Sequence, residues 1–274
     1  MSNRTPESDS GRGIEQPADK IATKLPEPNI WRETYPVRSY EVDCNGRLSA
    51  VSVFNFLQDA ASKHAQALGV SVHSMLSQNH TWLLSRLKIK LESYPGFNEQ
   101  VQVATWPSGS RRLFALRDFE VTNGTGDIFA RAVSGWLVLD TLKRRPVRVS
   151  SFVERLNPVD DRPALPDLLE KLAPLKESRH QRILKVRYRD LDINQHANNV
   201  SFVEWVLEGL PPGIQETAML TELEINFMAE VLADDIILSQ SCPIAEFPGG
   251  FCHTLVREGD GRELARARSV WKEK

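Results

Sequence analysis

The sequence predicts an α+β fold in which one helix-and-sheet unit occurs twice in tandem. Two internal matches lead to this prediction. Residues 37–60 align with residues 186–209 without a gap, and residues 126–136 align with residues 261–271. A self-match at both the start and the end of each half implies duplication of one structural unit. The identical pairs in the first match are Val37/Val186, Arg38/Arg187, Asp43/Asp192, Asn45/Asn194, Val51/Val200 and Ser52/Ser201.

Each unit is expected to begin with a short strand and a turn that lead into an apolar helix. The strands are predicted at 38–42 and 185–189, and the helices at 51–68 and 200–207. Apolar residues occupy most faces of both helices, which indicates helices with little solvent contact. The run Pro211-Pro212-Gly213 stops the second helix early, because proline cannot continue a helix.

Strand-like runs separated by glycine and aspartate turns follow each helix. One helix followed by four antiparallel strands, twice over, predicts two tandem hotdog folds: a central helix wrapped by a curved antiparallel sheet, doubled. The predicted strands are 82–91, 100–106, 113–122 and 128–140 in the first half, and 220–227, 235–242, 252–257 and 263–272 in the second.

The composition along the chain predicts four segments. Residues 1–29 are rich in Pro, Ser, Glu and Asp without periodicity and are expected to be a disordered tail. The first hotdog is expected at 30–150 and the second at 182–274. The proline-rich stretch 151–181 between them is expected to be mainly a linker, with a possible short helix at 167–172.

Composition and charge exclude several classes of function. The net charge of −2 gives no general attraction to nucleic acid, so any basic surface must be local. No apolar run approaches the roughly 20 residues of a membrane span. The N-terminus has neither the apolar core of a secretory signal nor the acid-poor composition of a transit peptide. Three cysteines without CxxC spacing indicate reduced thiols, and together these features predict a cytoplasmic protein.

The turn before the second helix concentrates groups that carry chemistry. Asp192 supplies a carboxylate, His196 an imidazole that moves protons near neutral pH, and Asn194 an amide that can hold water or a carbonyl oxygen. The turn runs into a helix N-terminus, so free backbone N–H groups near 199–201 can stabilise an oxyanion. No nucleotide-binding, serine-hydrolase or metalloprotease motif occurs, and the histidines lack metal-ligand spacing, so neither cofactor nor metal is expected.

The alternative is that this turn is only an elaborate helix cap, since Asp and Asn are favoured there. The repeat argues against that alternative. The first copy has Arg47 where the second has His196, and Ser49-Ala50 where the second has Asn198-Asn199. One complete copy and one degraded copy indicate a single active site in a duplicated scaffold.

The stretch DLDINQHANN (190–199), followed by an apolar helix, closely resembles the signature of the acyl-acyl carrier protein thioesterases of plants and bacteria. The likeness covers nearly everything from Tyr35 to the C-terminus. The resemblance implies catalytic roles for Asp192, Asn194 and His196.

The family's further carboxylate maps onto Glu230, in a strand expected after the second helix. Val231 stands where many family members have cysteine, so the resemblance provides no thiol nucleophile at that position. Glu204, on the second helix, is the fallback carboxylate, with a solvated surface residue as its equally good alternative.

The implied function is hydrolysis of the thioester of fatty acyl-acyl carrier protein, without a cofactor, which releases free fatty acid and ends chain elongation. Attack by water and direct attack by Asp192 remain open. The alternatives are an acyl-CoA thioesterase of the same fold and a non-catalytic acyl-binding double hotdog. The protein is expected to be a monomeric double hotdog or a homodimer, with acyl carrier protein as its partner.

The first half, which has lost the polar set, is expected to provide most of the acyl pocket. Phe54, Leu57 and Trp82 are the candidate lining residues, although ordinary core packing is the stronger explanation for each of them taken separately. Asn198 and Asn199 are expected to contact the substrate near the thioester. For docking of an acidic carrier, the candidates are Arg144 and Arg145, in the densest basic run of the chain; a solvated turn is the alternative.

Overall fold

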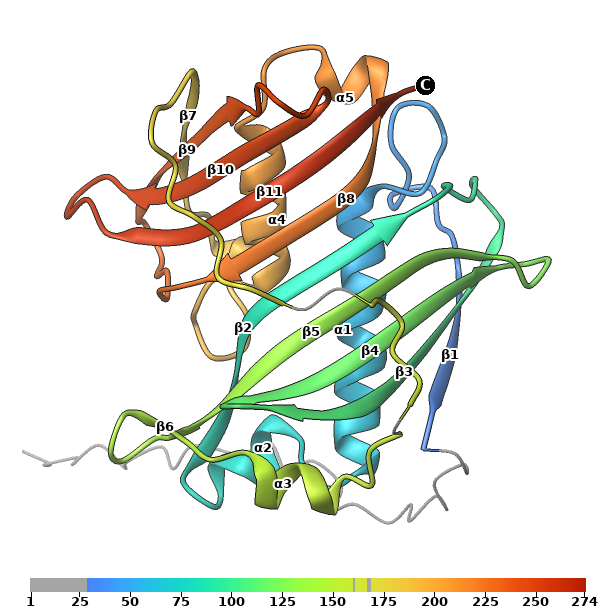
Figure 1. Ribbon diagram of the computed structural model, residues 1–274, viewed down its shortest axis with the longest axis vertical. Helices are drawn as coiled ribbons and strands as arrows, with labels where there is room; N and C mark the ends of the chain where they lie inside the picture. The colour runs from blue at the N-terminus through green and yellow to red at the C-terminus, as the bar shows by residue number, and fades with distance from the viewer. Residues whose placement is uncertain (1–28, 160, 167–168) are drawn as a thin grey trace, which may run out of the picture.

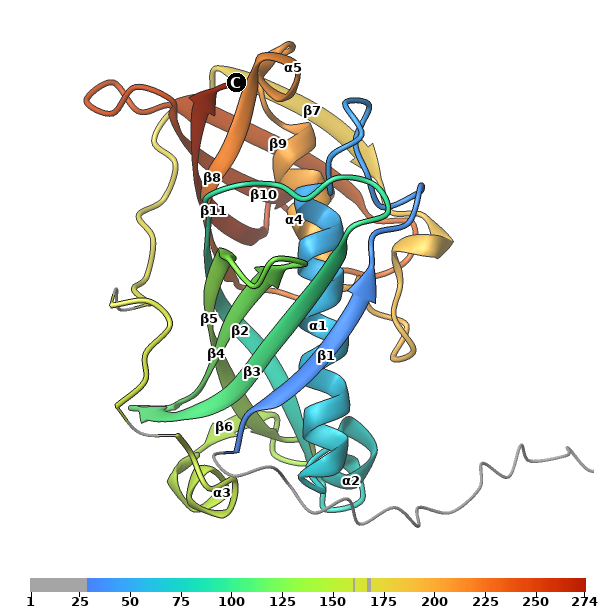
Figure 2. The same cartoon turned by 90° about the vertical axis from the view of Figure 1, so that its right-hand side faces the viewer.

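The computed structural model describes residues 29–159, 161–166 and 169–274, and it contains two helix-and-sheet units that share one sheet (Figure 1). The sheet curves around the helices α1 and α4, which lie on its concave side (Figure 2). The predicted double hotdog is therefore confirmed. The predicted disordered tail lies outside the described residues except for Asn29, which is buried.

The first half contains β1 (Trp31–Pro36), α1 (Ala50–Ala67), α2 (Val72–Leu76), β2 (His80–Leu91), β3 (Gln100–Arg111), β4 (Phe114–Asn123), β5 (Ile128–Asp140), β6 (Arg145–Val147) and α3 (Ser150–Arg155). The second half contains β7 (His180–Lys185), the 3₁₀ turn η1 (Tyr188–Asp190), α4 (Asn199–Glu208), α5 (Ile214–Thr217), β8 (Ala218–Phe227), β9 (Ile236–Pro243), β10 (Gly250–Arg257) and β11 (Glu263–Glu273).

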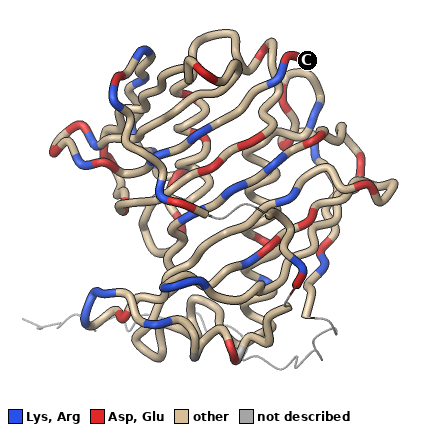
Figure 3. The backbone as a smooth tube through the Cα atoms, in the orientation of Figure 1, with Lys and Arg blue, Asp and Glu red and all other residues tan. Residues whose placement is uncertain are grey.

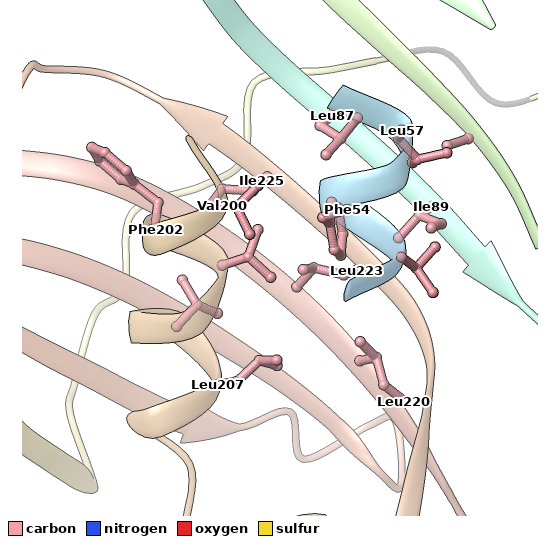
Figure 4. Packing of buried hydrophobic residues seen from close by; sticks show 14 of the residues in the cluster. Phe54, Leu57, Leu87, Ile89, Val200, Phe202, Leu207, Leu220, Leu223 and Ile225 are labelled. Carbon is pink, nitrogen blue, oxygen red and sulfur yellow. The ribbon is translucent and has the colours of Figure 1, made fainter. Parts of the chain in front are cut away.

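The two half-sheets join where β2 pairs antiparallel with β8, from Arg86 opposite Asn226 to Lys90 opposite Glu222. The strand order across the whole sheet is β1-β3-β4-β5-β2-β8-β11-β10-β9-β7, and β6 pairs with β5. Side chains alternate between the two faces of a strand, so one set at the joint points toward the helices. This inner set packs beneath α1 and α4 in one continuous core (Figure 4) and comprises Leu87, Ile89, Leu223 and Ile225.

The outer face of the same joint carries charges of both signs, visible as alternating colours along the strands (Figure 3). Lys88 Nζ lies 3.3 Å from Glu222 Oε1, and Arg268 Nη2 lies 2.9 Å from the same oxygen. The linker crosses this face, where Arg86 donates a hydrogen bond to the Leu169 carbonyl. Because Lys88 is buried, these pairs are better shielded from solvent than ordinary surface ion pairs. They help to hold the two halves in one orientation.

Most predicted elements are confirmed within two residues. One exception is β3, which continues to Arg111 instead of ending at 106; the others are the leading strands, which were placed wrongly. Residues 31–36 and 180–185 form the edge strands β1 and β7, instead of 38–42 and 185–189. The segment after β1 turns because Arg38 N–H donates to Glu41 Oε2 (2.8 Å) and Glu41 N–H donates to the Arg38 carbonyl (3.0 Å). A local hydrogen-bonded turn thus replaces the predicted pairing.

The predicted linker at 151–181 is partly structured. Most of α3 and the first two residues of β7 lie inside it, whereas residues 169–172 are not helical. Four further short elements, α2, β6, η1 and α5, were not predicted. In the described part of the chain, no helix combines the length and apolar character that a membrane crossing requires.

Candidate functional site

A cavity of about 790 Å³ runs along α1 and reaches the turn before α4. On one side it is lined by Phe54, Leu57, Ala61 and Ala65, which are spaced by three or four residues and therefore lie on one stripe of α1. Strands β2 to β5 supply the facing wall, and residues 191–195 of the second half close the cavity at its polar end. An apolar compartment of the first half thus opens onto the polar turn of the second.

Asp192 organises that polar turn. Its Oδ1 accepts hydrogen bonds from the backbone N–H groups of Asn194 (2.7 Å) and His196 (3.3 Å), and its Oδ2 accepts one from the Asn194 side chain (3.3 Å). The Asp192 N–H in turn donates to the His196 carbonyl (2.7 Å). Asp192 and Asn194 both line the cavity. The carboxylate therefore has a structural role in addition to any chemical one.

The degraded first copy keeps the same turn. Asp43 accepts hydrogen bonds from the N–H groups of Asn45 (2.8 Å) and Arg47 (3.1 Å), and from the Asn45 side chain (3.3 Å). Isolated β-bridges close both turns in the same way, Val42 with Leu48 and Leu191 with Ala197. The Asp–Asn pair is thus common to both copies, and the imidazole is what distinguishes the second.

His196 lies beside Glu230. Its Nδ1 is 3.9 Å from Glu230 Oε1, an ion-pair distance when the imidazole is protonated and longer than a hydrogen bond. The two segments are held together by Ala197 N–H, which donates to the Val231 carbonyl (2.9 Å). Glu230 follows the end of β8 at Phe227, so its predicted place within a strand is wrong. Neither His196 nor Glu230 is among the residues that line the cavity, so this pair lies behind the turn.

The N-terminus of α4 retains one free donor for an oxyanion. Asn198 is the N-cap, and its Oδ1 accepts a hydrogen bond from Val200 N–H (3.0 Å). Ser201 N–H donates to the Asn198 carbonyl (2.9 Å). Among the described residues the Asn199 N–H has no acceptor, and Asn199 lines the cavity. The cap interpretation therefore holds for Asn198, and of the three predicted oxyanion donors only that of Asn199 is free.

An ion pair between a buried carboxylate and a half-exposed arginine supports this turn and was not predicted. Asp190 is 2% exposed and accepts hydrogen bonds from the backbone and guanidinium of Arg187. Its carbonyl accepts from Asn198 N–H (2.8 Å) and the Ser201 hydroxyl (3.1 Å), which anchors the start of α4. Glu204 pairs with Arg187 at 3.2 Å, so the fallback carboxylate already has a partner. The repeat could have indicated this ion pair, because arginine occupies both aligned positions, Arg38 and Arg187.

The five candidate substrate-binding residues all line the cavity: Phe54, Leu57, Trp82, Asn198 and Asn199. Arg144 and Arg145 do not line it. Arg144 lies exposed in the turn between β5 and β6, and Arg145 lies exposed at the start of β6; within the described ranges neither forms an ion pair.

A buried cation in the cavity wall was also missed. Arg117, 9% exposed, donates hydrogen bonds to His64 Nδ1 (3.0 Å) and to the Thr105 hydroxyl (3.2 Å). Burial lowers the pKa of His64 to about 3, and the charge of Arg117 adds to the effect, so this imidazole is neutral. Its Nε2–H then donates to Asn29 Oδ1 (3.0 Å). Burial also lowers the pKa of Arg117, to about 10, so it remains charged at neutral pH.

Comparison with known proteins places this geometry in a family. The family described as "Acyl-ACP thioesterase N-terminal domain" matches residues 28–155, and the one described as "Acyl-ACP thioesterase C-terminal domain" matches residues 173–273. The chain belongs to the acyl-ACP thioesterase family. The first match covers the α1 side of the cavity, and the second covers the polar turn and Glu230.

Individual acyl-ACP thioesterases agree with this assignment. The chain is 30% identical over 268 residues to a chloroplastic palmitoyl-acyl carrier protein thioesterase of Gossypium hirsutum, covering 89% of this chain and 64% of that protein. It is 30% identical over 276 residues to the chloroplastic oleoyl-acyl carrier protein thioesterase 1 of Arabidopsis thaliana, covering 89% and 76%. An acyl-ACP thioesterase structure from Bacteroides thetaiotaomicron superposes with a TM-score of 0.80 at 26% identity, covering 90% of this chain and 99% of that one.

The positions of the cysteines bear on the nature of the nucleophile. Val231, where the resemblance implies a cysteine in many family members, is fully buried beneath the turn. None of the three cysteines lines the cavity, and Cys44 is exposed on the first-copy turn. The carboxylates and the imidazole are therefore the groups available for chemistry at this site.

Proposed function

We propose that the protein hydrolyses the thioester of fatty acyl-acyl carrier protein, releasing the free fatty acid and ending chain elongation. One observation carries the proposal: an apolar cavity of about 790 Å³ ends at a turn that presents Asp192 and Asn194, with His196 and Glu230 directly behind it. The cavity has the size and lining of a site for an elongated apolar ligand. The relatives named for palmitoyl and oleoyl carrier-protein substrates support the same substrate class.

The proposed roles follow from where each group lies. Asn194, in the wall of the cavity, orients water or the thioester carbonyl, and the Asn199 N–H donates to the oxygen that becomes negative. Asp192 and Glu230, aided by His196, orient and deprotonate the water, whose oxygen attacks the carbonyl carbon; the C–S bond breaks and the proton passes to the departing sulfur. Direct attack by Asp192 on the carbonyl is the other route. A single turnover in isotopically labelled water would place label in Asp192 only by that second route.

The experiment that tests the function compares hydrolysis of acyl-carrier-protein and acyl-CoA substrates across chain lengths. We expect kcat/KM to be higher for the carrier-bound substrate at every chain length that the cavity accepts. A preference for acyl-CoA would favour the first alternative, a CoA thioesterase of the same fold. Tight acyl binding without turnover of either substrate would favour a non-catalytic acyl-binding protein.

Docking of the carrier is proposed at the β5–β6 turn. Acyl carrier proteins are strongly acidic, and Arg144 and Arg145 are exposed there without acidic partners in the described ranges. Replacing both by glutamate is expected to raise KM for the carrier-bound substrate through slower association. The effect should shrink as salt rises toward ~0.5 M, because salt screens long-range attraction.

The control for this docking prediction is the double variant Arg111→Glu with Arg112→Glu, which reverses two charges near the turn between β3 and β4. We expect it to leave KM for the carrier-bound substrate nearly unchanged. Hydrolysis of a short uncharged thioester should be unaffected in both double variants. An unaltered KM for the Arg144/Arg145 variant at low salt would show that the carrier docks elsewhere.

The cytoplasm is proposed as the compartment, on the basis of three cysteines that form no disulfide within the described residues. A tagged chain that fractionates with an organelle or with the medium would contradict this proposal.

A further inference from the structure

The polar turn holds one residue in a strained backbone conformation. Gln195 has a φ of 62°, in the left-handed region that side chains with a Cβ rarely adopt. Its N–H donates to the Asp192 carbonyl (3.0 Å). The first copy has the same bond at the same position, from Gly46 to Asp43 (3.0 Å), and there the φ of 73° belongs to a glycine. The turn therefore calls for glycine, and the second copy has glutamine instead.

Within the described part of the protein, no hydrogen bond of the Gln195 side chain compensates this strain. Most other non-glycine residues with positive φ are Asn or Asp, whose short polar side chains tolerate this region, whereas glutamine does not share that advantage. No hydrogen bond joins the Gln195 carboxamide to any described residue. Strained residues of this kind cluster at functional sites, where the strain places a side chain. The carboxamide is therefore available to a ligand.

The position of Gln195 indicates which part of the ligand it meets. Gln195 lines the cavity next to Asp192 and Asn194, and it is solvent-exposed, as are Tyr188 and Ile193 at the same end. Phe54 and Leu57, on α1, line an apolar part of the same cavity. With the acyl chain inside and the thioester carbonyl at Asn194, the thiol side of the substrate passes Gln195 on its way out.

We propose that Gln195 is a substrate-positioning residue whose carboxamide hydrogen-bonds to the amide nearest the sulfur in the thiol arm of the substrate. This inference rests on the proposed function. The arm shared by carrier proteins and CoA contains secondary amides, each with one donor and one acceptor. A primary carboxamide presents the complementary acceptor and donors. The bond fixes the thioester carbonyl against Asn194 and the Asn199 N–H.

The test uses two thioesters of one acyl chain: the N-acetylcysteamine thioester, which keeps this amide, and the ethanethiol thioester, which lacks it. For Gln195→Ala, we expect kcat/KM to fall about 3- to 10-fold with the first substrate, the range that one hydrogen bond spans. With the second substrate it should stay within about twofold. Gln195→Gly should show the same kinetic split while its Tm is equal to or above that of the wild type, because glycine relieves the strain.

The repeat provides the matched control. Gly46→Gln places the same side chain at the same φ in the first copy, away from the cavity. We expect it to lower Tm by about 2–4 °C and to leave both rates unchanged. Equal losses on the two thioesters, or no loss on either, would overturn the role of Gln195. If the wild-type protein hydrolyses neither of the two small thioesters nor fatty acyl-acyl carrier protein, the proposed function itself is overturned.

Discussion

Replacing His196 by alanine is expected to lower kcat by about 10²–10⁴-fold, the usual contribution of a general acid–base group. The reason is that His196 is the one titratable group that the second turn has and the first turn lacks, and it lies 3.9 Å from Glu230. Asp192→Ala should produce a loss of the same order. The measurement is single-turnover hydrolysis of the thioester of fatty acyl-acyl carrier protein at saturating enzyme. This isolates the chemical step from product release.

The duplicated turn separates chemistry from folding in this experiment. Asp43 and Asp192 accept the same set of backbone and side-chain hydrogen bonds, so each alanine substitution removes equivalent structural contacts. Asp43→Ala is therefore expected to reduce the free energy of unfolding by about 1–2 kcal/mol, because a few partly exposed hydrogen bonds are lost, and to leave kcat nearly unchanged. A loss of turnover from Asp43→Ala that matches Asp192→Ala, with the fold intact, would refute the single-site interpretation.

The sequence was sufficient for most elements because their signals are local. Apolar residues at helical spacing located α1 and α4 within a residue, and glycine-containing turns delimited strands such as β5. The internal repeat then separated the polar turn of the second half from its degraded counterpart. Where the local signal was misleading, the prediction was wrong: Arg38 and Glu41 form an ion-paired turn (3.1 Å), whereas the true edge strand precedes it.

The spatial arrangement of the site depends on contacts between distant segments, which local sequence patterns do not predict. Glu230 reaches His196 because Ala197 N–H bonds to the Val231 carbonyl, and no local pattern encodes that contact. Arg117 sits in an ordinary-looking strand, and only the fold reveals that it is buried against His64. The strain at Gln195 was visible in principle, because the aligned position in the first copy is a glycine. The functional interpretation of this glutamine required its φ angle and its position in the lining of the cavity.

Enlarging Leu57 is expected to shorten the preferred acyl chain. Leu57 is 3% exposed and faces the cavity from α1, on the stripe that runs toward Ala65. A tryptophan there occupies space that the distal methylenes of a long chain would need. Each methylene that a hydrophobic pocket accepts or rejects typically changes kcat/KM by about tenfold or more. Leu57→Phe should give a smaller shift in the same direction, which tests the effect where the larger side chain perturbs folding.

The second helix provides the control for chain length. Val206 aligns with Leu57 in the repeat, is fully buried and does not line the cavity. Val206→Phe overpacks the core at the equivalent position, which typically costs about 1–3 kcal/mol of stability, while the cavity keeps its length. Its profile of kcat/KM against chain length should therefore match that of the wild type even if its Tm falls. If Leu57→Phe and Leu57→Trp also keep the wild-type profile while folded, the acyl chain does not occupy this cavity along α1, because a filled compartment cannot accept the same number of methylenes.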